Sequence, residues 1–476
     1  MKLSQAAKQV STHQAPHRSK GKQKSPKITA QDLESLPPLH LNAAGSDVGS
    51  AEHYVAVPAA RDPEPVQKFG SFTADLHRLA QWLQACHIDT VVMQATGVYW
   101  IGLYQVLEDY GCEVRVVNAR HTKTLPGRKT DVQECQWLQQ LHTFGPLNHS
   151  FRQSEAIRVL RSYIRQRENL VAAGSVCIQQ LQKALTEMNV QLANVISDLS
   201  GTTGMAILRA IVHGERDPYQ LAELKHSLIR ASREEIAQSL QGNWREELLF
   251  VLRQNLELYE MYQQKVRECD QHIAAHLKTL PDQVDGAQHP IPPPRRVSWS
   301  RQRQPGFDLR GELYRLTGVD LTQVDGLDVP TIQTVISEVG MDRSAWKTEK
   351  HFGSWLGLSP DNRISGGKVL KRGTRKAVNR AAMALRLAAW NLIRSQSALG
   401  AKFRPSAHPP GSPKAITAMA DHLPRLVYRM LKFGHAYVDR GIQHYATKYR
   451  QRQLAWLKKQ AASLNLQLVP LTEVAA

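Results

Sequence analysis

The order of short apolar segments between residues 39 and 150 constrains the fold more than any other feature of this chain. Three strand-like segments come first, at 39–47, 53–58 and 66–72. A helical pattern at 72–86, a strand at 90–94, a helix at 101–110 and a strand at 113–117 then follow. The segment at 72–86 repeats its apolar residues at the spacing of one helix face. This order predicts a mixed sheet with helices on its faces.

Acidic and amide side chains fall at the ends of the predicted strands. Asp47 closes the first strand and Gln94 closes the fourth. Asp131 and Glu134 are three residues apart, so on a helix they would share one face, with Cβ atoms roughly 5–6 Å apart. Carboxylates gathered in one place would hold Mg²⁺, a hard cation that takes oxygen ligands, and two such ions would activate a phosphodiester. Singly, Asp47 also fits a turn and Asp131 a helix cap, but the combination favours a metal site.

A second cluster of chemical groups surrounds Ser365, which precedes Gly366 and Gly367. Glycine has no Cβ, so the backbone there can approach another molecule closely. The cations that follow the glycines would hold a phosphate beside the serine hydroxyl; they are Lys368, Lys371, Arg372, Arg375 and Lys376. The hypothesis is that Ser365 attacks a phosphodiester, and the alternative is a Ser-Gly-Gly turn before a basic helix.

The charge balance points to a polyanionic partner. The chain has 61 Lys and Arg against 42 Asp and Glu, a formal net charge of +19, which favours nucleic acid. The five cysteines form no Cys-x-x-Cys pair, which fits a reducing cytosol. No uncharged apolar run is long enough to span a bilayer, and the basic N-terminus lacks the apolar core of a secretory signal.

Composition divides the 476 residues into six expected regions. They are a disordered basic arm at 1–38, a metal-binding α/β domain at 39–150, a helical region at 151–280, a Pro- and Arg-rich linker at 281–306, a compact, mostly helical serine domain at 307–450, and a basic C-terminal helix and tail at 451–476. Pro424 falls inside a predicted helix of the serine domain, and we expect a kink or break there.

The helical region contains a heptad-like apolar seam. Its residues are Leu181, Leu185, Met188, Leu192, Val195 and Leu199. A second helix is predicted from about Glu234 to Leu280, and the two would pair as a long antiparallel, coiled-coil-like hairpin.

Five motifs in order make the chain resemble the insertion-sequence 110 family of bacterial transposases. They are Gly-Ser-Asp47-Val-Gly, Met93-Gln94-Ala-Thr-Gly-Val-Tyr-Trp100, Asn118 through Asp131-Val-Gln-Glu134-Cys, Trp355-Leu-Gly-Leu-Ser-Pro360 and Ile364-Ser365-Gly-Gly-Lys368. The resemblance runs from about residue 39 to about residue 462.

The resemblance implies an RNase H/RuvC-like N-terminal domain with an Asp-Glu-Asp-Asp tetrad that binds Mg²⁺, and a serine-bearing C-terminal transposase domain. The tetrad falls on Asp47, Gln94, Asp131 and Glu134, and the serine nucleophile falls on Ser365. The resemblance further implies donor and target DNA as partners, a guide RNA encoded by the element, and a homo-oligomer, either a dimer or a tetramer, with a composite site. It also implies a bacterial cytoplasmic protein that associates with the nucleoid.

Two tetrad positions depart from the family pattern. Glu134 keeps a carboxylate in place of Asp, whereas Gln94 replaces a Glu by a neutral amide. We expect weaker metal affinity, or compensation by another carboxylate such as Glu52. Ser46 replaces a large aliphatic residue. Two other interpretations stay open: a decayed relic that only binds nucleic acid, and a RuvC-like junction nuclease that uses water in place of serine.

Overall fold

The computed structural model describes residues 37–95, 97–118, 130–145, 147, 150–286, 288–294, 305–371, 373–374, 379–404, 413–434 and 441–467. Most of the predicted basic arm, part of the predicted linker and the end of the predicted tail lie outside these residues. The chain divides into two compact units, Met1–Arg152 and Gln153–Ala476. None of the described helices has the length and apolar character needed to cross a membrane.

The first unit is built on a mixed five-stranded sheet. Its strands are β1 (Ala43–Val48), β2 (Glu52–Ala56), β3 (Val66–Gly70), β4 (Thr90–Ala95) and β5 (Glu113–Val117), in the order β3-β2-β1-β4-β5. The first three strands pair antiparallel, whereas β4 pairs parallel with both β1 and β5. The mixed sheet predicted from the segment order is therefore confirmed.

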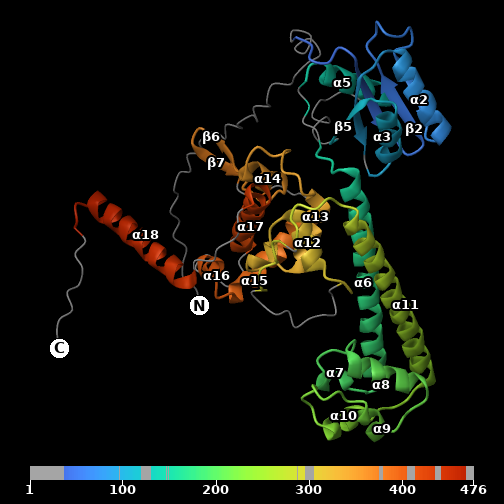
Figure 1. Cartoon of the computed structure of the whole chain (residues 1–476), viewed down its shortest axis with the longest axis vertical. Helices are drawn as coiled ribbons and strands as arrows, with labels where there is room; N and C mark the ends of the chain where they lie inside the picture. Colours follow the sequence, from blue (N-terminus) through green and yellow to red (C-terminus); the bar gives the residue numbers. More distant parts are fainter. Residues whose placement is uncertain are drawn as a thin grey trace, which may run out of the picture. The chain divides into compact units, whose positions relative to one another are not determined.

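Helices cover both faces of this sheet (Figure 1). Helices α2 (Thr73–Ala85) and α3 (Trp100–Asp109) pack their leucines against Ala44, Val91 and Met93 in one apolar core. Helix α5 (Asp131–Thr143) lies on the other face, where Leu138 packs against Val92 and Val117. Successive residues of a strand face opposite sides, so β1 and β4 contribute alternate residues to the two cores.

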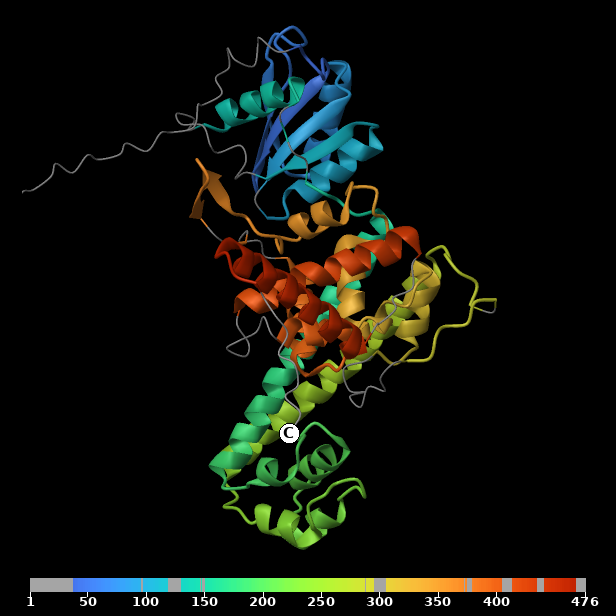
Figure 2. The same ribbon diagram turned by 90° about the vertical axis from the view of Figure 1, so that its left-hand side faces the viewer.

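The second unit begins with a long pair of helices, α6 (Glu155–Glu187) and α11 (Glu246–Lys278), which run side by side in both views (Figures 1 and 2). Ala156, near the start of α6, accepts a hydrogen bond from His276, near the end of α11, at 2.7 Å. Arg167 and Asp270 form a buried ion pair further along, at 2.5 Å. The antiparallel hairpin predicted for this region is confirmed.

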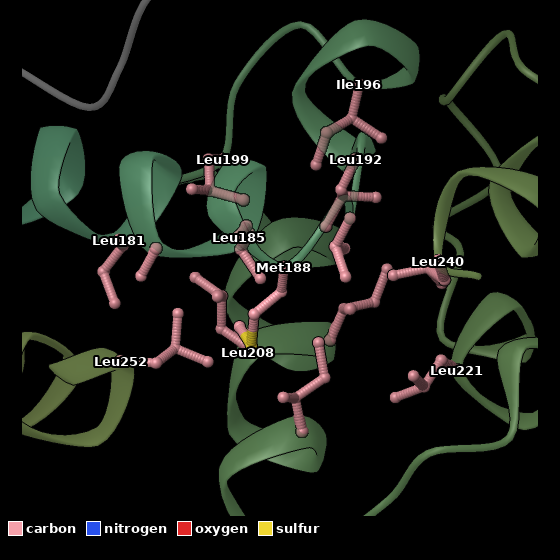
Figure 3. Close-up of a cluster of buried hydrophobic side chains, with 14 of the residues drawn as sticks. Leu181, Leu185, Met188, Leu192, Ile196, Leu199, Leu208, Leu221, Leu240 and Leu252 are labelled. Atoms are coloured by element: carbon pink, nitrogen blue, oxygen red, sulfur yellow. The ribbon is translucent and has the colours of Figure 1, made fainter. Parts of the chain in front are cut away.

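The prediction that the residues of the apolar seam lie on one helix is wrong. Helix α6 ends at Glu187 because Asn189 takes a left-handed conformation, with φ of 56°, and the chain then turns into the short helix α7 (Leu192–Val195). The seam residues instead line a compact core at the end of the helical pair (Figure 3). Helices α8 (Thr202–Val212), α9 (Pro218–Glu223) and α10 (Arg233–Ser239) complete this core.

The predicted second helix is also divided. Helix α10 ends at Ser239, and α11 begins only at Glu246. Between them, Asn243 donates its backbone N–H to Met188 at 2.8 Å, and an added Cβ on Gly242 would lie 2.7 Å from the same carbonyl. The chain leaves the helix here because it must pass close to the turn that ends α6.

The rest of the second unit is mostly helical. Its elements are α12 (Leu309–Thr317), η1 (Leu321–Gln323), α13 (Val329–Val339), α14 (Glu349–Trp355), β6 (Arg363–Ser365), β7 (Lys368–Lys371), α15 (Arg380–Asn391), η2 (Leu392–Arg394), α16 (Ala398–Phe403), α17 (Pro413–Phe433) and α18 (Gly441–Ser463). Helix α17 continues through Pro424, so the break expected there is absent from this described helix.

Candidate active site

The pairing of β1 with β4 brings two predicted site residues side by side. These neighbouring strands run parallel, and their register places Asp47 opposite Gln94. Both positions fall one residue before the end of their strand, at the same edge of the sheet. In an open sheet, ligands bind beyond the carboxyl ends of parallel strands, and these two side chains stand at that edge.

Helix α5 brings the acidic pair to the same edge, and Gly45 permits the approach. An added Cβ on Gly45 would lie 2.2 Å from the Gln139 nitrogen and 2.4 Å from the Cys135 carbonyl oxygen, so only glycine fits between β1 and the helix. Thr130 caps α5 by accepting a hydrogen bond from the Gln133 N–H. Asp131 and Glu134 therefore both lie in the first turn.

The amide of Gln94 connects the two carboxylates nearest to it. Its Nε2 donates to Glu134 Oε2 at 3.0 Å and to Asp47 Oδ1 at 3.5 Å. The Gln94 side chain is buried, with the residue only 5% exposed. The structure thus brings together Asp47, Gln94 and Glu134, while Asp131 lies one position into the helix with an exposed side chain.

The donor set of this cluster suits a hard cation. It offers two carboxylates and one amide, all with oxygen donors, and Mg²⁺ is typically held by one or two carboxylates and several waters. Among the described residues, no group of three or more His, Cys, Asp or Glu side chains is placed so that it could hold a metal ion. In this cluster, the Gln94 amide stands beside only two carboxylates, those of Asp47 and Glu134. Glu52, expected as a compensating carboxylate, instead pairs with Lys68 at 2.7 Å.

Cys135 lies directly behind the acidic cluster. Burial raises the pKa of its thiol to about 12, and the nearby Asp47 and Asp131 carboxylates add to the increase. The thiol donates to the Val132 carbonyl at 3.1 Å. Cys135 is fully buried, and its thiol stays protonated at neutral pH, so it packs α5 against the sheet as a small apolar residue.

Ser365 lies on a two-stranded hairpin in the second unit. It pairs with Lys368 across β6 and β7, and Gly366 and Gly367 form the two-residue turn, with φ of 55° and 74°. Positive φ at both turn residues is the pattern of a type I′ hairpin turn. Neither the predicted loop nor the alternative turn before a basic helix included this strand pair.

Register decides which side chains share a face of this hairpin. Ser365 and Lys368 are directly opposite, so their Cβ atoms lie about 4.5–5.5 Å apart on one face. Ile364 and Val369 are the next pair and occupy the other face. All four side chains are exposed, and the described chain places no atom within 4 Å of an added Cβ on either turn glycine.

The base of the hairpin is fixed to the helices. Before β6, the Ser359 hydroxyl donates to the buried Asp421 carboxylate of α17 at 2.8 Å. Beyond β7, Gly373 accepts the backbone N–H of Asp361 at 2.7 Å, and Arg380 bonds Glu168 of α6 at 2.6 Å. Sequence reasoning missed the Ser359–Asp421 link because the two residues are 62 positions apart with no local signal.

The predicted phosphate-binding cations are only partly described. Lys368 is exposed beside Ser365, and Lys371 ends β7. Arg372, Arg375 and Lys376 lie outside the described residues.

A five-stranded sheet of this order, with helices on both faces, defines the first unit as an RNase H-like domain of the kind found in transposases. Residues 44–190 match a family model described as a transposase and named for the Asp-Glu-Asp-Asp transposases of the IS110 type. Residues 320–404 match a model described as "Transposase IS116/IS110/IS902 family". No curated protein sequence matches the chain. The chain belongs to the IS110 family of transposases, with the acidic domain first and the second family domain after it.

Proposed function

We propose that this transposase cuts and rejoins DNA through a covalent link to Ser365, assisted by Mg²⁺ at the carboxylate cluster of the first unit. Family membership implies DNA transposition and DNA binding. The observation that carries the finer proposal is the convergence of Asp47, Gln94 and Glu134 at one sheet edge, within 3.0–3.5 Å of the Gln94 amide.

The acidic cluster would bind the cation through its oxygens. Asp47 and Glu134 would be the charged ligands, Asp131 a third carboxylate from the first turn of α5, and Gln94 a neutral ligand once its amide turns its oxygen toward the site. When bound, Mg²⁺ would polarise the scissile phosphate and offset charge in the transition state. Binding requires Gln94 to give up its two hydrogen bonds, so we expect weaker affinity than a third carboxylate would provide.

Ser365 would act as the nucleophile. Its Oγ forms a bond to phosphorus while the bond from phosphorus to one deoxyribose oxygen breaks. The serine proton goes to solvent, and the released deoxyribose oxygen takes a proton from solvent, so atoms and charge balance. The phosphodiester to Ser365 conserves the bond for rejoining when a second deoxyribose hydroxyl attacks it. Lys368, on the same face, would hold a non-bridging oxygen of this phosphate.

The proposed partners follow from the charge and the family. Donor and target DNA would be bound by a homo-oligomer, and a guide RNA encoded by the element would select the sites. The net charge of +19 supports a large nucleic-acid surface. Sequencing the RNA that co-purifies with the protein from its host tests this point, because one discrete RNA from the element is expected and a random sample of cellular RNA contradicts it.

Trapping the covalent intermediate tests the nucleophile. The wild-type protein, incubated with DNA carrying the ends of its element and Mg²⁺ and then denatured, should give a protein–DNA adduct whose linked peptide contains Ser365. Ser365→Ala should abolish the adduct and recombination while DNA binding survives. Ser175→Ala, which removes an exposed serine of α6, is the matched control and should react normally.

The Gln94 hydrogen bonds also favour a second candidate, a relic that binds nucleic acid without chemistry. The amide already satisfies both carboxylates in the absence of a cation. In that case, neither adduct nor strand transfer forms with any metal. A junction nuclease that uses water would instead cleave DNA with Ser365→Ala as well as with the wild type.

A further inference from the structure

The side chains of the Ser365 hairpin are exposed on both of its faces. None of the described residues from 359 to 374 is buried, and the large apolar side chains Ile364, Val369 and Leu370 are 63%, 41% and 71% exposed. Figure 1 shows the two strands projecting beside α14 and α17. A two-stranded hairpin by itself is marginally stable in water, so the direction of this one depends on how its base is held.

The chain enters the hairpin from a packed segment, and a hydroxyl fixes it at that point. Leu358, shortly after the end of α14, is 1% exposed. Ser359 is the next residue, and its Oγ donates to Asp421 Oδ1 of α17 at 2.8 Å. Pro360 then forms a bridge to Thr374 on the returning chain. The Ser359 hydroxyl therefore ties the first residues of the hairpin to α17.

Asp421 is held in one orientation through both of its oxygens. The residue is 9% exposed, and its second oxygen accepts a hydrogen bond from Arg425, one turn further along α17. Burying a carboxylate is costly unless it is paired, and hydrogen bonds to an ionised group are stronger than those between neutral groups. When the Ser359 hydroxyl is removed, Asp421 keeps its ion pair with Arg425, so the fold should survive.

We propose that Ser359 and Asp421 are positioning residues, which aim the hairpin so that Ser365 reaches the phosphate in line for attack. This inference rests on the proposed function, because it assigns the hydrogen bond a role in the reaction of Ser365. A displacement of about 1 Å at a reacting group can slow a reaction by about 100-fold. Ser365 lies at the far end of its strand, next to the turn, so a small rotation at the base is enlarged there.

Single-turnover formation of the Ser365 adduct by the full-length protein measures this role. The substrate is saturating DNA that carries the ends of the element, with Mg²⁺ present. Ser359→Ala should slow adduct formation by about 10- to 100-fold while the Kd for DNA stays unchanged. Ser359→Thr keeps the hydroxyl and should recover most of the rate. Combining Ser359→Ala with Asp421→Asn should slow the reaction no more than the slower single variant, because both act through one hydrogen bond.

Tyr428→Phe is the matched control for loss of a buried hydrogen bond in α17. The Tyr428 hydroxyl donates to the Trp346 carbonyl at 2.7 Å, in the segment before α14. This variant should lose about as much stability as Ser359→Ala and still form the adduct at the parental rate. Equal slowing by Tyr428→Phe and Ser359→Ala would overturn the positioning role, since a general loss of stability would then explain both results.

Hydrogen exchange of the DNA-free protein tests the link without the chemistry. Ser359→Ala should speed exchange in peptides covering residues 359–374 and leave those of α14 and α17 unchanged, whereas Tyr428→Phe should not speed exchange in the hairpin. Parental exchange in the hairpin of Ser359→Ala, or a parental rate of adduct formation, would overturn the inference. A wild-type protein that forms no adduct, together with faster hairpin exchange in Ser359→Ala, would overturn the nucleophile and retain Ser359 and Asp421 as the residues that hold the hairpin.

Discussion

The two proposed halves of the chemistry are built in opposite ways. Asp47, Gln94 and Glu134 stand on a packed sheet and a helix pressed against it, whereas Ser365 stands on an exposed two-stranded hairpin. The geometry of the carboxylate cluster is set by the register of β1 and β4 and by Gly45, where a side chain would collide with α5. The shape of the Ser365 hairpin is set by its two-glycine turn and by hydrogen bonds at its base, such as that from Ser359 to Asp421. Rigid packing suits a site that must hold a small cation, and an exposed ribbon suits a group that must reach a large substrate.

Because of this difference, we expect single substitutions of similar size to affect stability and activity unequally in the two regions. The largest effect is expected at Gly45. Gly45→Ala would place a Cβ 2.2 Å from the backbone of α5. The helix must move, so we expect a loss of roughly 2–3 kcal/mol in unfolding free energy and loss of strand transfer. Denaturant unfolding followed by circular dichroism measures the first effect.

Gly102→Ala is the matched control for Gly45→Ala. Gly102 lies inside α3, and an added Cβ there meets only a Leu76 methyl at an ordinary 3.6 Å. Alanine in a helix is favoured over glycine by about 0.5–1 kcal/mol, so this variant should be as stable as the parent or more so. If both variants unfold alike, the close approach of α5 to β1 is wrong.

Gln94→Glu tests how the acidic cluster of the first unit responds to a third carboxylate. The variant loses two donated hydrogen bonds and places three carboxylates together, so without metal we expect about 2 kcal/mol less stability at neutral pH. Mg²⁺ should recover this loss, and the rise in melting temperature with 10 mM Mg²⁺, a concentration chosen to be about saturating for such a site, should exceed that of the wild type.

Gln94→Leu is the control that separates loss of the amide from gain of a negative charge in Gln94→Glu. It removes the amide without adding a carboxylate, so Mg²⁺ should not rescue its stability. An equal response of the glutamate and leucine variants to Mg²⁺ would contradict a cation site at this edge.

In the hairpin, Gly366→Ala should have a smaller and more local effect. The added Cβ meets no described atom, but φ of 55° costs a non-glycine residue about 1 kcal/mol. We expect the main thermal transition to stay unchanged and strand transfer to fall several-fold. Gly366→Asn, which tolerates this conformation, should keep more activity. A lowered melting temperature for Gly366→Ala would show that the hairpin is part of the packed core.

The smallest effect is expected at Ser46 and has the opposite sign. Ser46 is fully buried on the α2 and α3 side of β1, and its hydroxyl bonds no described group. Ser46→Ala should raise the free energy of unfolding by about 1 kcal/mol, because an unsatisfied buried hydroxyl is removed. Ser50→Ala, at an exposed position just beyond β1, should change nothing measurable. Destabilisation by Ser46→Ala would reveal a hydrogen bond that the geometry does not show.

The chain's local patterns predicted much of the first unit and less of the second. The strand at 113–117 has the predicted bounds, and the other strands are displaced by a few residues at most, because alternation and breaker residues act over short distances. The apolar seam was predicted as one helix because its leucines repeat at helical spacing. Asn189 ends that helix through its own left-handed backbone, and the same leucines then pack into a different core.

The sequence by itself determined the succession of strands and helices along the first unit, the position of Asp47 and Gln94 near strand ends, and the family of the chain. These properties depend on neighbouring residues or on motifs in fixed order. Only the tertiary structure decided that Gln94 donates to both carboxylates and that Gly45 admits α5. It also decided that Ser365 shares a hairpin face with Lys368, and that Ser359 bonds Asp421. Most of these contacts join residues tens of positions apart, and the hairpin depends on which register two strands adopt. Register and packing minimise the free energy of the whole fold, which no local pattern records.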